Sequence, residues 1–272
     1  MPRPNSLAAR ADRHVLYQRA VQCPEADVDF VDRTLRKLRG RTPACLREDF
    51  CGTGAISCEW ARRRAANTAL GLDLHQPTLE WGLKHNVAKL SPGARARVRL
   101  IRRNVLTPGV GAGGMDAILA FNFSYWVFKE RETLRRYFRA VRRSLARGGA
   151  FFLDIYGGYE LLKECRDRQQ IGGSRGFTYF WDQARCDPLT GETLCHIHFR
   201  LRDGSWLRRA FTYDWRAWSV PEVREVLAEA GFKRSTVYWE GDDGKGGGNG
   251  IFRPAKRGEA CASFIAYIVA ER

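Results

Sequence analysis

The chain has 272 residues, of which 44% are hydrophobic, and a net charge of +16. This length fits one domain, or one domain with a sizeable insertion, and the hydrophobic fraction is ordinary for a globular protein. No apolar run approaches the ~20 residues that cross a bilayer, and the N-terminus lacks the apolar segment of a signal peptide. The composition therefore excludes a protein that crosses a membrane with helices.

The eight cysteines are scattered, and no two form a Cys-x-x-Cys pair. This pattern indicates reduced thiols in the cytoplasm, and neither a disulfide framework nor a zinc site.

Most of the 46 basic residues are arginines, spread over predicted helices and the 95–103 segment. The favoured interpretation of this positive charge is that the arginines lie on solvated helix faces. The alternative is that they bind RNA or another anionic partner.

Helical spacing of apolar residues predicts two helices ahead of the core, at residues 7–22 and about 25–38, the second ended by Gly40. From Ala44 onward, short apolar strands alternate with amphipathic helices, which is typical of a parallel sheet covered on both faces. The strands are predicted at about 44–50, 68–73, 98–105, 116–122 and 150–156, and the helices at about 54–65, 77–89 and 131–146.

The pattern changes after residue 157, where three long strands (177–186, 192–201 and 206–218) alternate with turns. A helix at 220–230 and two strands, at about 233–240 and 262–270, follow; a glycine-rich loop at 241–250 joins these strands. The predicted scheme has four parts: an N-terminal helical cap (1–43), an α/β core (44–157), an antiparallel insertion or lid (158–218) and a C-terminal completion of the core (219–272).

One stretch indicates ligand binding: a strand ending in Glu48-Asp-Phe50, a turn with Gly52 and Gly54, a helix, and a strand ending in Asp73. Such a turn admits a ligand close to the backbone, and the carboxylate at the second strand tip suits a ribose. A dinucleotide fingerprint has a third glycine where this chain has Ser57. An acidic Glu48 or Asp49 suits a cationic amino-acid tail and would repel a pyrophosphate.

Glu48-Asp-Phe-Cys-Gly-Thr-Gly54 with Asp73 resembles motif I and the following acidic motif of class I S-adenosylmethionine (SAM)-dependent methyltransferases. Phe50 stands where the family has its first glycine, so we expect a different loop there. The resemblance covers about 44–157 and 219–272 and implies an α/β fold with a doubly wound, mostly parallel, seven-stranded, Rossmann-like sheet. The insertion after the fifth strand also resembles the small-molecule branch, such as glycine N-methyltransferase and the amino-sugar N-methyltransferases, where it roofs the acceptor pocket.

The resemblance implies SAM as cofactor and S-adenosylhomocysteine as product, and it assigns cofactor contacts to residues at the strand tips. Gly52, Thr53 and Gly54 would lie beneath the methionine portion, and Asp73 would accept the ribose hydroxyls. The other implied contacts are Glu48 or Asp49 at the amino-acid tail, Leu74 on the adenine, Asn104 with its neighbour Val105 at the adenine edge, and Phe121 and Asn122 on the methionine side. Asn104 could instead form a turn, and Tyr17 is either a lid contact or a helix-packing residue.

The fourth strand tip, Asn122-Phe-Ser-Tyr-Trp126, partly matches the (D/N)-P-P-(Y/F) motif of amine methyltransferases. Asn122, Tyr125 and Trp126 are therefore the candidate catalytic residues, placed to orient an acceptor or receive its proton. An aromatic packing role is the equal alternative for Tyr125 and Trp126. We expect the acceptor site between this tip and the insertion, because ligands of doubly wound sheets bind at the carboxyl ends of the strands.

Methyl transfer from a sulfonium is an in-line displacement that requires no metal. The best metal candidate, His196-x-His198, is interpreted instead as a solvent-facing stripe. Two acceptors remain open: a small amine or hydroxyl compound enclosed by aromatic side chains of the insertion, and an RNA held by the arginines. The aromatic set is Tyr179, Trp181, Tyr213 and Trp215. A non-catalytic SAM-binding module is a third, minor alternative.

Overall fold

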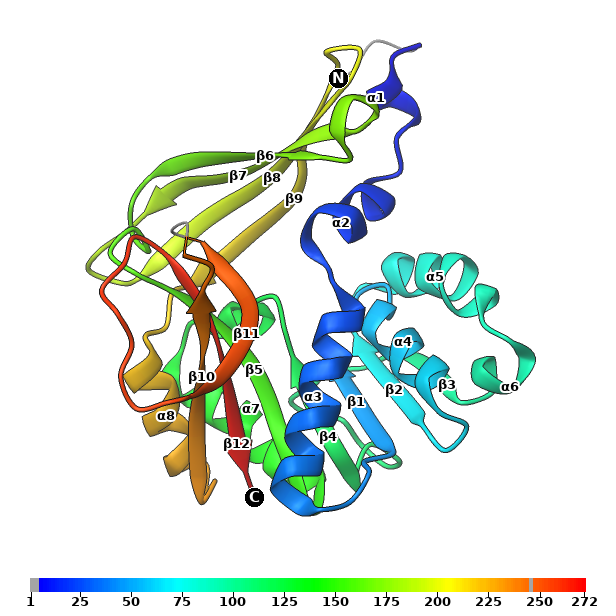
Figure 1. Ribbon diagram of the computed structural model, residues 1–272, viewed down its shortest axis with the longest axis vertical. Coiled ribbons are helices and arrows are strands. Elements are labelled where there is room, and N and C mark those ends of the chain that lie inside the picture. Colours follow the sequence, from blue (N-terminus) through cyan, green and yellow to red (C-terminus); the bar gives the residue numbers. More distant parts are fainter. Residues whose placement is uncertain (1–4, 245–246) are drawn as a thin grey trace. The chain divides into compact units, whose positions relative to one another are not determined.

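The computed structural model describes residues 5–244 and 247–272 (Figure 1). The chain divides into two compact units: Met1–Cys23 with Tyr159–Ala217, and Pro24–Gly158 with Trp218–Arg272. The predicted cap of residues 1–43 is therefore split between the two units. The reason is packing, because Leu16 and Tyr17 join the apolar cluster of the insertion, whereas the helix that starts at Pro24 packs on the core sheet.

The larger unit contains a sheet of eight strands in the order β11-β10-β12-β5-β4-β1-β2-β3 (Figure 1). The strands are β1 (Cys45–Asp49), β2 (Thr68–Asp73), β3 (Val98–Arg102), β4 (Met115–Ala120), β5 (Leu145–Gly157), β10 (Arg234–Asp242), β11 (Gly248–Ala255) and β12 (Phe264–Glu271). Strands β1 to β5 pair in parallel, whereas β12 pairs antiparallel with both β5 and β10. The predicted doubly wound, mostly parallel sheet is confirmed.

The predicted number of seven strands is wrong, because the region assigned to a glycine-rich loop continues into β11. This strand pairs only with β10 and lies at the edge of the sheet. Most of its residues are exposed. An edge strand without a buried face carries no apolar alternation, so its residues show no pattern that predicts a strand.

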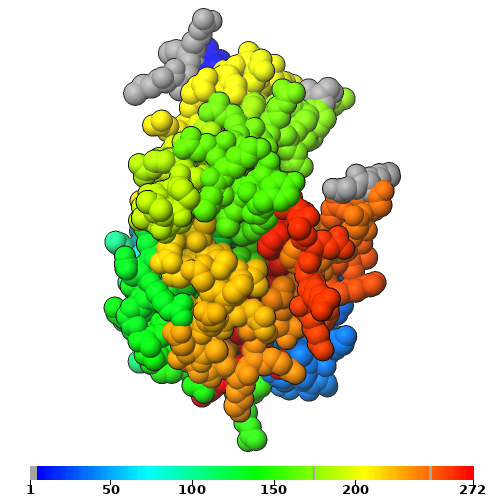
Figure 2. Space-filling model, turned by 90° about the vertical axis from the view of Figure 1, so that its left-hand side faces the viewer, coloured from blue at the N-terminus to red at the C-terminus, as the bar shows by residue number. Residues whose placement is uncertain are grey.

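Helices cover both faces of this sheet. They are α3 (Pro24–Arg39), α4 (Ala55–Arg63), α5 (Gln76–His85), α6 (Pro92–Arg95), α7 (Arg131–Ser144) and α8 (Val220–Glu229), with short 3₁₀ turns at Val87–Lys89 and Ser124–Val127. Phe30 of α3 packs on Phe152, whereas Phe138 of α7 packs on Phe151. Since consecutive strand residues point to opposite faces, α3 and α7 lie on opposite sides of β5. Figure 2 shows the side on which α8 lies against α7.

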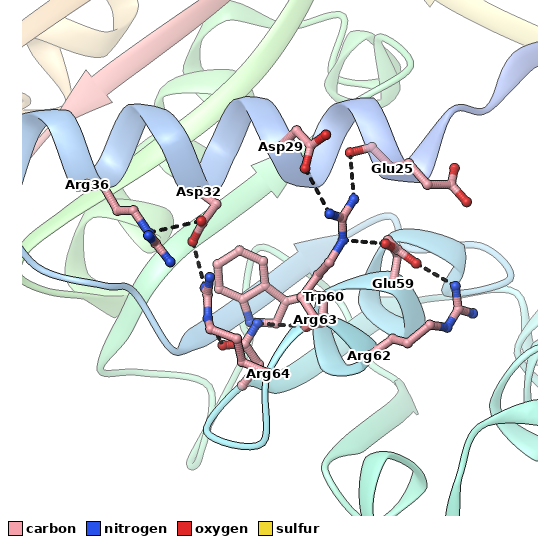
Figure 3. Close-up of polar contacts among 10 residues, drawn as sticks. Glu25, Asp29, Asp32, Arg36, Glu59, Trp60, Arg62, Arg63 and Arg64 are labelled. Atoms are coloured by element: carbon pink, nitrogen blue, oxygen red, sulfur yellow. Dashed lines mark hydrogen bonds and ion pairs between the residues drawn. The ribbon is translucent and has the colours of Figure 1, made fainter.

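A network of ion pairs joins α3 to α4 (Figure 3). Arg63 lies 3.0 Å from Asp29, and Arg64 lies 2.6 Å from Asp32, which also pairs with Arg36 at 3.0 Å. Several of the arginines are therefore paired with carboxylates of the same unit, in partly exposed positions. In the part of the chain that the structure describes, no helix has both the length and the apolar character needed to cross a membrane.

The smaller unit contains a four-stranded antiparallel sheet in the order β6-β7-β8-β9. Its elements are α1 (Leu7–Arg10), α2 (Arg13–Val21), β6 (Cys165–Ile171), the 3₁₀ turn Gly173–Arg175, β7 (Phe177–Cys186), β8 (Glu192–Leu201) and β9 (Trp206–Arg216). The three predicted strands are present, but β6 is an additional, charged and exposed edge strand. The single predicted helix at 7–22 is also wrong: Asp12 breaks it by accepting hydrogen bonds from the backbone of His14 and Val15.

Candidate active site

The turn after β1 is built from left-handed backbone conformations. Phe50, Gly52 and Gly54 have φ angles of 56°, 52° and 67°. Phe50 thus adopts the conformation that glycine reaches most easily, and its ring is held near Phe128 and Tyr137, with centroids 5.8 and 5.6 Å away. Aromatic packing thereby allows a glycine-like backbone at the position where a different loop was expected.

Asp73 ties the tip of β2 to this turn. Its Oδ2 accepts a hydrogen bond from the backbone of Gly52 at 2.8 Å, and its Oδ1 accepts one from His75, also at 2.8 Å. A carboxylate offers about four acceptor positions, so both oxygens can still receive donors from a ligand. The next residue, Leu74, is 59% exposed and offers an apolar surface beside the carboxylate.

Glu48 is buried beneath the same turn. Its Oε2 accepts hydrogen bonds from the backbone N–H and the hydroxyl of Ser57, at 2.9 and 2.6 Å. Ser57, the residue that departs from the dinucleotide fingerprint, thus uses its hydroxyl to hold Glu48 at the N-terminus of α4. Burial raises the pKa of Glu48 to about 7, although both hydrogen bonds favour the ionised form.

Asp49 has a different role from the predicted one. Its carboxylate faces Arg47, with Nε–Oδ1 and Nη2–Oδ2 distances of 2.8 and 3.0 Å, and accepts a hydrogen bond from the Tyr137 hydroxyl at 2.9 Å. Both Arg47 and Asp49 are fully buried. Since Glu48 and Asp49 are consecutive on β1, they point to opposite faces of the sheet. Of the two acidic candidates, only Glu48 lies with the glycine turn.

Gly82 is a component of the site that the sequence analysis missed. It lies inside α5, and a Cβ at this position would be 2.4 Å from the carbonyl oxygen of Thr53. The same carbonyl accepts a hydrogen bond from Asn86 Nδ2 at 2.9 Å. The signal in the sequence was a glycine in the middle of a helical segment, which often marks a close approach of another chain segment.

The tip of β3 carries a turn. Asn104 Oδ1 accepts a hydrogen bond from the backbone of Leu106 at 2.9 Å, and its carbonyl accepts one from Thr107 at 3.1 Å. Asn104 is exposed, whereas Val105 is buried. This geometry supports the turn-forming alternative for Asn104, and its amide nitrogen remains at the surface.

At the tip of β4, Phe121 is buried and its ring lies 5.2 Å from that of Tyr267. Tyr125 is fully buried and donates its hydroxyl to the carbonyl of Asp154 at 3.0 Å, and burial holds its pKa well above the usual range. Trp126 is also buried. The packing alternative is therefore favoured for Tyr125 and Trp126 over contact with an acceptor, and of the three catalytic candidates only Asn122 is partly exposed.

A second missed residue, Asp154, holds this tip. Asn122 and Phe123 both have left-handed backbones, with φ angles of 56° and 54°. Their N–H groups donate to Asp154 Oδ2 and Oδ1 at 2.7 and 2.9 Å. The signal for Asp154 was a single carboxylate within the apolar run Phe151-Phe-Leu-Asp-Ile155.

In the smaller unit, Tyr17 of α2 packs against Phe211, with ring centroids 4.8 Å apart. This contact agrees with the helix-packing alternative for Tyr17. The proposed acceptor aromatics also contact one another, with centroids 4.3 Å apart for Tyr213 and Trp215 and 6.0 Å apart for Trp181 and Tyr213.

The interpretation of His196 and His198 as a solvent-facing stripe is wrong, because both are buried. His198 Nδ1 accepts a hydrogen bond from the backbone of Arg209 at 2.9 Å, so its Nε2 carries the proton and donates to Asp182 at 3.0 Å. His196 Nδ1 lies 2.9 Å from the hydroxyl of Thr212. Among residues 5–244 and 247–272, no group of three or more acidic, histidine or cysteine side chains is arranged to hold a metal ion.

The comparison with protein families bears on the larger unit. The family described as "Methyltransferase domain" matches residues 49–153. This segment of the chain is similar to a methyltransferase domain. The domain begins at the end of β1 and runs into β5, so it contains the glycine turn, Asp73 and the β4 tip. No sequence among the curated proteins matches the chain.

Solved structures with a similar fold extend over nearly the whole chain. A SAM-dependent methyltransferase from Clostridium acetobutylicum is 18% identical with a TM-score of 0.67, covering 95% of this chain and 96% of that one. SAM-bound CalS10, an amino pentose methyltransferase from Micromonospora echinaspora, is 19% identical with a TM-score of 0.68, covering 95% of each chain. KedS8, a sugar N-methyltransferase from a Streptoalloteichus species, is 16% identical with a TM-score of 0.66, covering 96% of this chain and 93% of that one. The chain thus has the class I methyltransferase fold, with its antiparallel insertion.

Proposed function

We propose that the protein is a SAM-dependent methyltransferase that binds the cofactor over the glycine turn of the methyltransferase domain. The observation that supports this proposal is the hydrogen bond from Gly52 to Asp73, which joins the turn after β1 to the tip of β2. Ligands of doubly wound sheets bind at the carboxyl ends of the strands, where this turn lies. Asp73 would accept the ribose hydroxyls, and Leu74 would cover the adenine. Gly52, Thr53 and Gly54 would lie beneath the methionine portion.

The charge of the site supports a cationic cofactor. Glu48 is the next-to-last residue of β1 and Asp73 is the last residue of the neighbouring strand β2. Asp154 is buried on β5, three residues before that strand ends. Neither Glu48 nor Asp154 has an ion-pair partner in the described part of the chain. Bound SAM supplies a methyl group activated by its positive sulfur. The carboxylates would favour that charge, and the buried turn would exclude water from the methionine side.

We propose a nitrogen of a small molecule as the acceptor. The structural neighbours CalS10 and KedS8 are described as an amino pentose methyltransferase and a sugar N-methyltransferase, which supports an amino sugar as the first class to test. Asn122, partly exposed beside the β4 tip, is the residue proposed to orient the acceptor. Tyr125 is not retained in this role, because its hydroxyl already donates to the Asp154 carbonyl.

The experiment is transfer of a labelled methyl group from SAM to matched acceptors. An amino sugar is compared with the same sugar carrying a hydroxyl in place of the amine, and both are compared with a mixed RNA. Label on the amino sugar alone is the expected result. Label on the hydroxyl sugar would identify an oxygen acceptor, and label on RNA that persists at physiological salt would replace the small-molecule proposal with an RNA methyltransferase.

A further inference from the structure

The tip of β4 has an unusual backbone. Asn122 and Phe123 are consecutive, neither is glycine, and both have φ angles above 50°. Asparagine tolerates the left-handed region, but a bulky aromatic residue rarely adopts it. Such a conformation persists only where the surroundings enforce it, and it is concentrated at functional sites.

The carboxylate of Asp154 enforces this conformation. Each oxygen accepts one backbone N–H, from Asn122 at 2.7 Å and from Phe123 at 2.9 Å. Successive N–H groups that converge in this way form an anion-binding nest. Asp154 is 7% exposed, and no cationic side chain in the described ranges pairs with it. The nest therefore provides the main local compensation for the buried charge.

Asp154 is itself fixed by the sheet. It pairs with Tyr267 of β12, and its neighbour Leu153 pairs with Ala120, the last residue of β4. Its backbone carbonyl accepts the hydroxyl of Tyr125 at 3.0 Å. One residue of β5 thus holds three groups of the β4 tip: two backbone N–H groups and one side-chain hydroxyl.

We propose that Asp154 is a positioning residue for methyl transfer, acting through the backbone of Asn122 and Phe123 to hold the acceptor-orienting tip of β4. This inference rests on the proposed function, because it assigns the tip to the acceptor side. It goes beyond that function by naming a residue that need not touch either substrate. Loss of the nest should reduce turnover and leave cofactor affinity nearly unchanged.

The nest depends on ionisation of Asp154. A protonated carboxyl carries hydrogen on one oxygen, which then accepts poorly from a backbone N–H. Burial raises the pKa of Asp154 to about 7, the hydrogen bonds from Phe123 and Asn122 lower it, and the nearby charge of Asp27 raises it. Asp27 lies on α3 and accepts a hydrogen bond from Tyr267 at 2.9 Å. Two tyrosines also contact this part of the structure: Tyr267 pairs with Asp154 and donates its hydroxyl to Asp27, and Tyr125 donates its hydroxyl to the Asp154 carbonyl.

The test compares Asp154→Asn with Asp116→Asn. Asp116 is an equally buried carboxylate, and it accepts two backbone N–H groups, from Ala44 and Cys45 at 2.8 and 3.0 Å. It lies at the opposite, amino-terminal end of β4, away from the ligand edge. An asparagine has one acceptor oxygen and one amide donor, so Asp154→Asn leaves one of the two backbone N–H groups unsatisfied. Asp116 accepts both backbone N–H groups on Oδ2 and pairs with Arg41 through Oδ1, so Asp116→Asn can keep both backbone hydrogen bonds and loses the ion pair. Stability should fall in both variants.

Only Asp154→Asn should reduce kcat, by about 10²-fold, which is the loss that a misplacement of about 1 Å causes. The KM for SAM should stay within a few-fold of the wild-type value. Wild-type kcat should rise with pH with an apparent pKa near 7, because the nest needs an ionised Asp154. This rise should disappear in Asp154→Asn and persist in Asp116→Asn. Wild-type kcat and an unchanged pH profile in Asp154→Asn would overturn the inference.

A second readout separates this inference from the proposed function. Amide hydrogen exchange at Asn122 and Phe123 reports the nest directly, without SAM or an acceptor. Protection of both amides that is lost on acidification through pH 7 in the wild type, and that is missing from one of the two amides at all pH values in Asp154→Asn, supports the nest even if SAM does not bind. Equal protection in the two proteins would refute it.

Discussion

Gly82→Ala tests whether α5 shapes the glycine turn. The added Cβ would lie 2.4 Å from the Thr53 carbonyl oxygen, 2.8 Å from the carbonyl carbon and 3.0 Å from Cα. All three are backbone atoms, so no side-chain rotation relieves the contact. Thr53 is buried, and it lies between Gly52 and Gly54. We therefore expect the turn to shift away from α5.

The magnitude follows from two opposing effects. Replacing glycine by alanine inside a helix stabilises it by ~0.5–1 kcal/mol. Overpacking against backbone destabilises by ~1–3 kcal/mol. The net expected loss is about 1–2 kcal/mol. Gly93→Ala is the matched control, because Gly93 also lies in a helix and an added Cβ there would meet no heavy atom within 4 Å.

Urea denaturation of both variants gives the stability difference, and titration with SAM gives the change in affinity. Gly93→Ala should match or exceed the wild-type stability and bind SAM normally. Gly82→Ala should be less stable and bind SAM about tenfold more weakly, which corresponds to ~1.4 kcal/mol. Equal stability and affinity in the two variants would show that α5 does not constrain the turn.

Three further predictions concern charged side chains. Arg47→Met leaves Asp49 buried without its cation and should destabilise by ~3–5 kcal/mol in urea denaturation, whereas replacing Asp49 by Leu as well should restore most of the loss. Burial raises the pKa values of Asp27 and Glu48 to about 6 and 7, so the folded state binds more protons than the unfolded one between pH 4 and 7. Stability should fall as the pH rises through that range, and Glu48→Gln should flatten the decline. Asp73→Ala should weaken SAM binding by ~1.5–3 kcal/mol in a calorimetric titration while the circular dichroism spectrum stays unchanged.

The parallel part of the fold could be predicted because its strands are buried on both faces. Strands such as β4, buried along its whole length, read as continuous apolar runs. β6 and β11 could not be predicted, because an exposed edge strand needs no apolar pattern and forms only by pairing with a neighbour. Asp12 is a residue type that often caps the start of a helix. Apolar residues at helical spacing on both sides of it nevertheless favoured one continuous helix.

Part of the site could be predicted because the order of the strands along the chain determines which strand ends meet. Gly52 and Asp73 follow from chain order, since neighbouring parallel strands bring their carboxyl ends together. The separate roles of Glu48 and Asp49 depend on which face of β1 each side chain occupies, and adjacent residues always differ in that respect. The packing of Tyr125 and the contacts of Asp154 and Gly82 arise between segments far apart in sequence, so only the folded structure brings them together.

Calorimetric titration of the wild-type protein with SAM, with NAD as the competing ligand class, tests the central claim most directly. The acidic Glu48 beneath the turn and Asp73 at the β2 tip predict SAM binding with a dissociation constant of about micromolar order and no measurable binding of NAD. Tight binding of NAD with no binding of SAM would contradict the proposed function.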